Sequence, residues 1–210
     1  MGSKFSISEV CSTSWQRTKA QIWVLSGLII GMSIISFTLG VFAMPIQQSV
    51  MGAIVINLIS CIISCIFALG YMKNIFQALD GEEPQFSAYG QQARKIITYL
   101  VANILMAIIV TLGLCLFIIP GIYLALRLQF YAALIVEDDA GIIESLQRSW
   151  EITRGQEMSL FMLMLAMIGI CILGLILLGI GIFVAMPLIY MMYAYVFRKL
   201  NAPLQILEEV

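Results

Sequence analysis

The chain has no histidine and very little charge. Only 11% of its 210 residues are charged, and the net charge is -1. Without histidine the chain lacks the commonest general base, the Ser-His and Cys-His nucleophile pairs, and histidine-ligated iron or zinc. It also has no basic domain or arm, so nucleic acid is not an expected partner. We therefore expect no enzyme activity, no cofactor and no metal site.

Cysteine is the next group that could support chemistry. The five cysteines stand singly in apolar or amphipathic runs, without a CxxC motif or metal-ligand spacing. Cys61 and Cys65 do fall on one helix face, four residues apart. We interpret all five as small apolar packing residues.

Apolar residues, by contrast, are abundant. They make up 61% of the chain, and the mean hydropathy is +1.01. A soluble domain is about half apolar and about 25% charged, so a soluble core could not bury this much apolar surface. The composition therefore predicts a membrane protein.

Six apolar runs could cross a bilayer. The first, second, third and fifth have 21 to 24 residues, which is enough for a hydrocarbon core of about 30 Å. The fourth and sixth have only 16 residues each and require a thinner bilayer or shielding by a neighbour. We predict an all-α, polytopic fold with six transmembrane helices, at residues 22–44, 50–72, 96–119, 121–136, 158–178 and 182–197.

Along the chain, uncharged connections between the predicted spans alternate with charged ones. Residues 43–49, Pro120-Gly121 and residues 179–181 are short and uncharged. The other connections and both ends of the chain hold every acid, and every base except Arg127. Since positive charge stays inside, we expect the N- and C-termini to be cytoplasmic. Trp15, Trp23 and Trp150 lie on that same side, where they suit headgroup-level anchors.

An internal repeat runs through the chain. Residues 8–21 (SEVCSTSWQRTKAQ) align without gaps with residues 143–156 (IESLQRSWEITRGQ). We predict three repeated hairpin units at about 5–73, 74–139 and 140–200, each beginning with a cytoplasmic amphipathic helix, although the middle unit matches poorly. In the third unit the apolar positions recur at helical spacing. That helix either lies in the headgroup region or caps the bundle without a lipid role.

Three stretches resemble one group of bacterial membrane proteins. They are residues 79–95, residues 116–139 with the PGIYLALR element, and residues 142–155 with the Ser-Trp-Glu helix. The group comprises YciC-like uncharacterised integral membrane proteins and the membrane domain joined to some glycerophosphodiester phosphodiesterases. The resemblance implies a multi-pass protein of the bacterial inner membrane, connected with the envelope and close to phospholipid headgroups. The phosphodiesterase activity belongs to a separate soluble domain, so it does not transfer to this chain.

Arg127 is the one charged residue among the predicted spans. It lies about 10 Å from Pro120 and about 15 Å from Glu137 along a helix, and charge at mid-span is costly. In a structural interpretation the guanidinium snorkels, or bonds to carbonyls freed near Pro120 and to Asn57 or Asn103. In a functional one it holds an anionic lipid phosphate or headgroup. We expect no buried ion pair, because no acid falls within a predicted span.

Further candidates lie near the cytoplasmic face and the turns. A basic rim could contact anionic phospholipid; it consists of Arg94, Lys95, Arg148 and Arg154. Pro120 and Gly121 should form the turn before the fourth span, and Pro187 should kink the sixth. The acidic run at residues 137–139 is expected to be a solvated turn, with a divalent-cation site as the less favoured alternative.

Glycines spaced for helix packing mark two of the spans. Gly27 and Gly31 form a GxxxG motif in the first, and Gly169, Gly174 and Gly179 mark the fifth. We expect these glycines to allow close helix contact within the monomer rather than dimerisation.

The sequence thus favours a non-enzymatic integral membrane protein that organises lipid or a membrane partner, including a homo-oligomer. The alternative is a transporter or lipid-flipping carrier in which Arg127 contacts an anionic headgroup. Carriers usually have broken helices that converge at mid-membrane. Here the predicted breaks fall at turns, which favours the first hypothesis.

Overall fold

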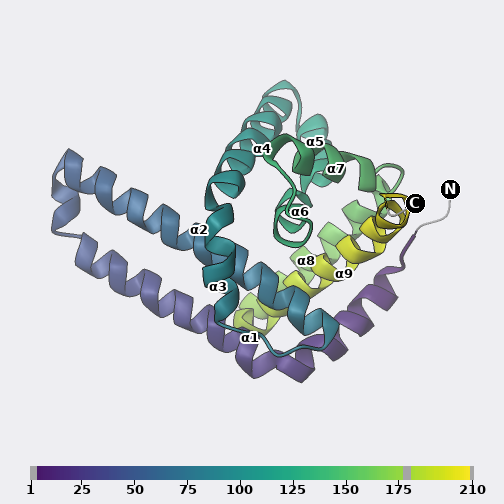
Figure 1. Ribbon diagram of the computed structural model, residues 1–210, viewed down its shortest axis with the longest axis horizontal. Helices are drawn as coiled ribbons and strands as arrows, with labels where there is room; N and C mark the ends of the chain where they lie inside the picture. The colour runs from purple at the N-terminus through teal and green to yellow at the C-terminus, as the bar shows by residue number, and fades with distance from the viewer. Residues whose placement is uncertain (1–3, 177–180, 209–210) are drawn as a thin grey trace.

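The computed structural model describes residues 4–176 and 181–208, and this part of the chain is helical without strands (Figure 1). Six segments are long and apolar enough to cross a membrane, which confirms the prediction of an all-α chain with six such helices. The elements are α1 (Ile7–Ala43), η1 (Ile46–Gln48), α2 (Val50–Asp80), α3 (Ser87–Gln92), η2 (Ala93–Lys95), α4 (Ile96–Leu116), α5 (Ile118–Leu128), α6 (Tyr131–Glu137), α7 (Ile142–Ile152), α8 (Glu157–Ile176) and α9 (Ile182–Glu208).

The long helices form three hairpins, α1–α2, α4–α5 and α8–α9 (Figure 1). The α1–α2 hairpin projects away from the rest, while α1 also packs along α9. The start of α1, the end of α2, α6, α7 and the end of α9 hold most of the charged residues, and we call this the polar end.

Whether the hairpins repeat one ancestral unit stays a prediction. The predicted turn at 179–181 falls mostly on residues outside the described part.

Helix α1 changes direction at one residue. Ser6 caps its start by accepting a hydrogen bond from the Glu9 amide at 3.2 Å. Gln21 has non-helical backbone angles (φ -122°, ψ 16°), and this kink divides α1 into two helical parts. The kink falls at the predicted boundary between the cytoplasmic segment and the first span.

The turn into the fourth span lies earlier than predicted. The chain reverses at Phe117, which is extended (φ -160°, ψ 154°), and α5 starts at the next residue. Pro120 therefore lies in the first turn of α5, where a missing backbone N–H leaves no bond unmade. Gly121 packs so closely on α4 that a Cβ there would be 2.3 Å from a Leu114 methyl. Its lack of a side chain allows the tight α4–α5 crossing.

Helix α9 contains Pro187 but remains helical from Ile182 to Glu208. Proline cannot donate to the carbonyl four residues earlier, which belongs to Phe183. That carbonyl instead accepts a hydrogen bond of 2.8 Å from the Ser26 hydroxyl of α1. The group freed by proline is thereby satisfied by a neighbouring helix, as apolar surroundings require. The predicted kink stays a prediction.

The glycine predictions have mixed outcomes. A Cβ at Gly174 would be 2.9 Å from the Ala185 Cβ, so this glycine does permit close contact between α8 and α9. A Cβ at Gly27, Gly31 or Gly169 would have no neighbour within 4 Å. The prediction of close packing within the chain is therefore wrong for these three glycines.

The Ser26–Phe183 hydrogen bond can be tested with a double-mutant cycle. Ser26→Ala should lower the free energy of unfolding by about 1 kcal/mol, because it leaves a carbonyl unpaired. In a Pro187→Ala background the same change should cost clearly less, since residue 187 then supplies the missing N–H. Unfolding by dodecyl sulfate in mixed micelles measures both values. Equal losses in the two backgrounds would contradict this account.

Candidate functional site

The fourth span is broken at Gln129 and Phe130, between α5 and α6. The predicted span at 121–136 is present within Ile118–Glu137, but the expectation that breaks fall only at turns is wrong. The Arg127 carbonyl accepts hydrogen bonds from the Ser149 hydroxyl at 2.9 Å and the Thr153 hydroxyl at 3.1 Å. The Phe130 amide donates to the Ser149 oxygen at 3.1 Å. Two hydroxyls of α7 therefore replace the helical bonds that the break removes.

The break is also held from α9. The Tyr193 hydroxyl donates to the Gln129 carbonyl at 2.7 Å, and the Tyr193 ring packs on Phe130 with centroids 4.9 Å apart. Backbone groups that lose their helical hydrogen bonds in apolar surroundings need partners from within the protein. Here α7 and α9 supply them, so the break is stabilised by the fold.

The Arg127 side chain, 2% exposed, is an internal group. Its Nη1 lies 2.8 Å from a carboxylate oxygen of Glu157, the first residue of α8. The guanidinium also lies over the ring of Trp150, 4.2 Å from the centroid, and 5.8 Å from that of Tyr123. The expectation that Arg127 has no acidic partner is therefore wrong. Glu157 was overlooked because it precedes the predicted fifth span by one residue.

Arg127 connects three elements that are distant in sequence. Its backbone binds α7, its side chain binds α8, and its own helix is α5. Cation–π contact with a desolvated arginine contributes up to about 2 kcal/mol. One donor stays without a partner, since the Nε atom is buried and makes no hydrogen bond. Trp150 packs on this arginine and is still 37% exposed, so its predicted role as a headgroup anchor stays a prediction.

Glu137 is the centre of an ion-pair network at the polar end. One carboxylate oxygen accepts from Lys73 of α2 at 2.9 Å, and the other from Arg198 of α9 at 2.6 Å. Arg198 also pairs with Asp80 at 2.9 Å. The Glu137 side chain is 11% exposed, so its charge needs this compensation. The network joins α2, α6 and α9.

The next two acids bind other elements. Asp138 accepts from Arg148 of α7 at 2.8 Å and from the Asn201 amide of α9 at 2.9 Å. Asp139 pairs with Lys95 at 2.6 Å and Arg94 at 3.4 Å. The hydrogen bond from Lys95 holds the pKa of Asp139 below its usual value, so this carboxylate is ionised at neutral pH. The acidic run therefore joins helices, and the expectation of a solvated turn is wrong for Glu137 and Asp138, which are each 11% exposed, while Asp139 is 63% exposed.

The basic rim divides into two pairs. Lys95 is buried, and its ammonium also donates to the Ile135 and Val136 carbonyls, while Arg148 is only 13% exposed. These two cations hold the fold together. Arg94 is 74% exposed and Arg154 is exposed, so both face the surroundings. Contact of any of the four with lipid stays a prediction.

Helix α7 packs one face against the bundle and leaves another exposed. Ser145, Leu146, Ser149 and Ile152 are buried, whereas Ile143 is 54% exposed. The helix therefore packs against the bundle, which fits both of the proposed interpretations. Its location in a headgroup layer stays a prediction.

Sequence analysis missed a group of tyrosines near the polar end. The rings of Tyr99 and Tyr131 stack at 6.0 Å, and Tyr71 meets Tyr190 edge-on at 5.2 Å. The buried Tyr71 hydroxyl has no hydrogen-bond partner. Tyr71, Tyr99 and Tyr131 lie close to the charged ends of their predicted spans, and that position was the available signal, whereas Tyr190 lies in the middle of its span. These rings give α2, α4, α6 and α9 a polar interior within an apolar bundle.

The described residues contain no group of three or more histidines, cysteines or acids that could hold a metal ion. The cysteines described there are free. Asn57, considered as a partner for Arg127, instead donates to the Ala53 carbonyl of its own helix at 2.7 Å. The site is thus a structural assembly of ion pairs, hydroxyls and rings.

The Arg127–Glu157 pair predicts an asymmetry between two substitutions. Glu157→Gln leaves a buried cation without a counter-charge and should lower the free energy of unfolding by about 2–3 kcal/mol, somewhat less than for a fully buried pair. Arg127→Met should cost less, because Glu157 is 34% exposed and water can solvate it. Unfolding in mixed micelles measures both. A loss for Glu157→Gln within about 0.5 kcal/mol of zero, as expected for an unpaired exposed acid, would contradict the assigned pairing.

The acidic run predicts a second difference. Glu137→Gln weakens two ion pairs at once and should lower the free energy of unfolding by about 2 kcal/mol. Glu151→Gln is the matched control, because Glu151 is exposed on α7 and should stay within about 0.5 kcal/mol of the wild type. Indistinguishable values for the two variants would show that the network does not support the fold.

Comparison with known proteins gives one match. No curated protein and no solved structure matches the chain. A family model matches residues 86–210, which run from the start of α3 to the C-terminus and so include the α4–α5 and α8–α9 hairpins, the break at Phe130 and the acidic run. The chain therefore belongs to the family described as a domain of unknown function, DUF7847.

Proposed function

We propose that this chain is a non-enzymatic protein of the bacterial inner membrane that organises lipid, or a membrane partner, around its hairpins. The polar end faces the cytoplasm, with both termini. One observation supports this most: the charges at the polar end largely neutralise one another, while the spans remain apolar and open. Only 6% of the apolar window in α1 and 11% in α2 is buried. Such surface requires lipid or a partner to cover it.

The exposed cations suit a headgroup layer. Arg94 and Arg154 face outward at the polar end, where anionic headgroups would meet them. The resemblance to YciC-like proteins and phosphodiesterase-linked membrane domains is consistent with an envelope role near phospholipids, and it stays a proposal.

A carrier is the second candidate, and two observations favour it. The fourth span is broken, as in many carriers. The buried Arg127 also retains an unpaired Nε donor, which an anionic headgroup could accept from once Glu157 moves away. Against this, the break is already satisfied by Ser149 and Tyr193, and the guanidinium already has a carboxylate.

A flipping assay separates the two candidates. Vesicles that contain the purified chain and a fluorescent phospholipid are exposed to dithionite, which bleaches only the outer leaflet. We expect the same bleached fraction as in protein-free vesicles, with phospholipid retained when the chain is purified in mild detergent. Full bleaching that is lost in Arg127→Met would overturn the proposal and establish the carrier. Purification without any retained phospholipid would also contradict it.

A further inference from the structure

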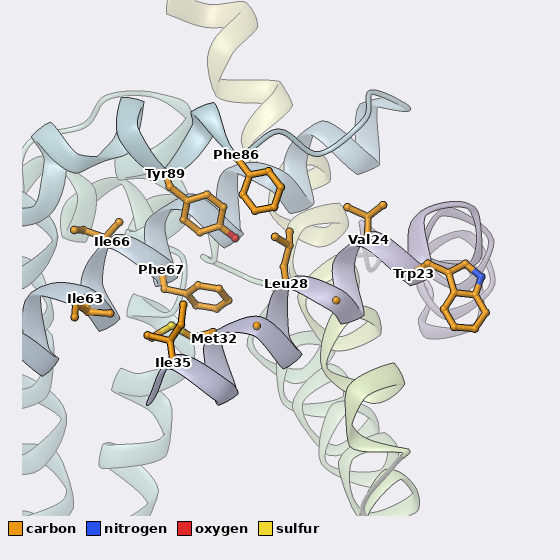
Figure 2. A pocket seen from close by; sticks show the side chains of 12 residues that line it. Trp23, Val24, Leu28, Met32, Ile35, Ile63, Ile66, Phe67, Phe86 and Tyr89 are labelled. Carbon is orange, nitrogen blue, oxygen red and sulfur yellow. The ribbon is translucent and has the colours of Figure 1, made fainter. Parts of the chain in front are cut away.

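An apolar groove lies between α1, α2 and the start of α3 (Figure 2). Figure 2 shows Phe86 and Tyr89 reaching from α3 toward Phe67 of α2, with Leu28 and Met32 of α1 on the opposite side. The groove encloses about 570 Å³. It is separate from the Arg127 site and from the acidic run.

Two glycines keep the groove open. Gly27 and Gly31 of α1 line it, and a Cβ at either position would have no neighbour within 4 Å. The GxxxG motif thus leaves a channel along α1 that larger residues would fill. Tyr89 closes the side toward α2, because it packs directly on Gly70, where a Cβ would come within 2.3 Å of its ring.

The length of the groove indicates what fits it. It runs along α1 from Trp23 to Ile35, twelve residues or about 18 Å. Half of a hydrocarbon core is about 15 Å, whereas a transmembrane helix needs about 30 Å of apolar contact. The groove therefore matches an acyl chain of one leaflet better than a helix from a second copy.

The mouth of the groove is exposed and aromatic. Trp23 is 89% exposed and Phe86 is 81% exposed. Trp23 follows the kink at Gln21, so it lies where the span begins and where indole rings favour the membrane interface. The groove thus opens at the headgroup level of the polar-end leaflet.

Charges of both signs flank this mouth. Arg17 lies on α1 just before the kink, and Glu82 and Glu83 lie on the loop before Phe86. The two segments are neighbours, since the side-chain amide of Gln21 donates to the Glu82 carbonyl at 3.4 Å, and a Cβ at Gly81 would lie 3.5 Å from the Arg17 guanidinium. Lys19 falls on another side of α1, where its ammonium lies over the Trp15 ring, 5.6 Å from the centroid. Within the described residues Arg17, Glu82 and Glu83 enter no ion pair, in contrast to the acidic run. One cation and two carboxylates complement a headgroup that carries a phosphate and an ammonium.

We propose that the groove binds one acyl chain of a phospholipid with a phosphoethanolamine headgroup. The phosphate lies toward Arg17, and the ammonium toward Glu82 and Glu83. This inference rests on the proposed function and deepens it by naming a lipid and a site. No lipid needs to cross the membrane for it to hold.

Native mass spectrometry of the full chain tests the proposal, with phosphatidylethanolamine titrated into the detergent-solubilised protein. Gly31→Leu projects a side chain into the groove from a position where an added Cβ has no neighbour within 4 Å, so it should fold and weaken binding about tenfold, which corresponds to about 1.4 kcal/mol. Gly169→Leu is the matched control, because that glycine is equally open but lies on α8 outside the groove. It should bind as the wild type does. Circular dichroism confirms folding of both variants.

Further titrations test the headgroup. Arg17→Gln should also weaken binding of phosphatidylethanolamine, whereas Lys19→Gln should leave it unchanged, because the Lys19 ammonium lies over Trp15. Phosphatidylglycerol should bind the wild type less tightly. Equal retention by Gly31→Leu and wild type would overturn the groove assignment while leaving the proposed function intact. Tighter binding of phosphatidylglycerol would overturn the headgroup assignment. A wild-type dimer that Gly31→Leu converts to a monomer would replace the lipid with a second copy.

Discussion

The consecutive acids Glu137, Asp138 and Asp139 hold the polar end of the protein together. Between them they bind cations of α2, η2, α7 and α9; α2, η2 and α9 are distant in sequence, whereas α7 is the next helix. Charges placed in or near a bilayer are stable only when they are paired or solvated. Because short α6 ends in this run, it is fixed in the middle of the helices that the acids bind (Figure 1). The hairpins extend outward from that centre.

The same requirement for partners explains the break in the fourth span. A helix interrupted at Gln129 and Phe130 frees backbone groups, and apolar surroundings offer nothing to bind them. Ser149 and Thr153, four residues apart on α7, supply small hydroxyls within reach. The predicted repeat pairs them with Ser14 and Thr18 of α1, which are also fully buried. Small polar residues at this spacing thus let two different helices pack closely onto the bundle.

Prediction from the sequence was reliable where one physical effect, the hydrophobicity of long segments, decides the structure. Long apolar runs and the one-sided charge pattern predicted six helices, and the boundary at Gln21 was found within the longest of them. It failed where the outcome depends on which residues meet in three dimensions. Glu157 was read as a loop acid because nothing in the sequence brings α8 beside α5, and Gly27 and Gly31 were read as a packing motif although no helix lies against them. The hydroxyl groups near Tyr71 and Tyr131 were not predicted as a polar interior, because tyrosine is counted as an apolar residue in the composition.

The central claim is that charge pairing by the acidic run fixes the polar end. Dipolar EPR in bilayers tests it directly, with the native cysteines replaced and spin labels at the exposed positions Gln16 of α1 and Glu151 of α7. The account predicts one narrow distance distribution, which broadens when Glu137 becomes glutamine. A distribution that stays narrow and unchanged in Glu137→Gln would contradict it.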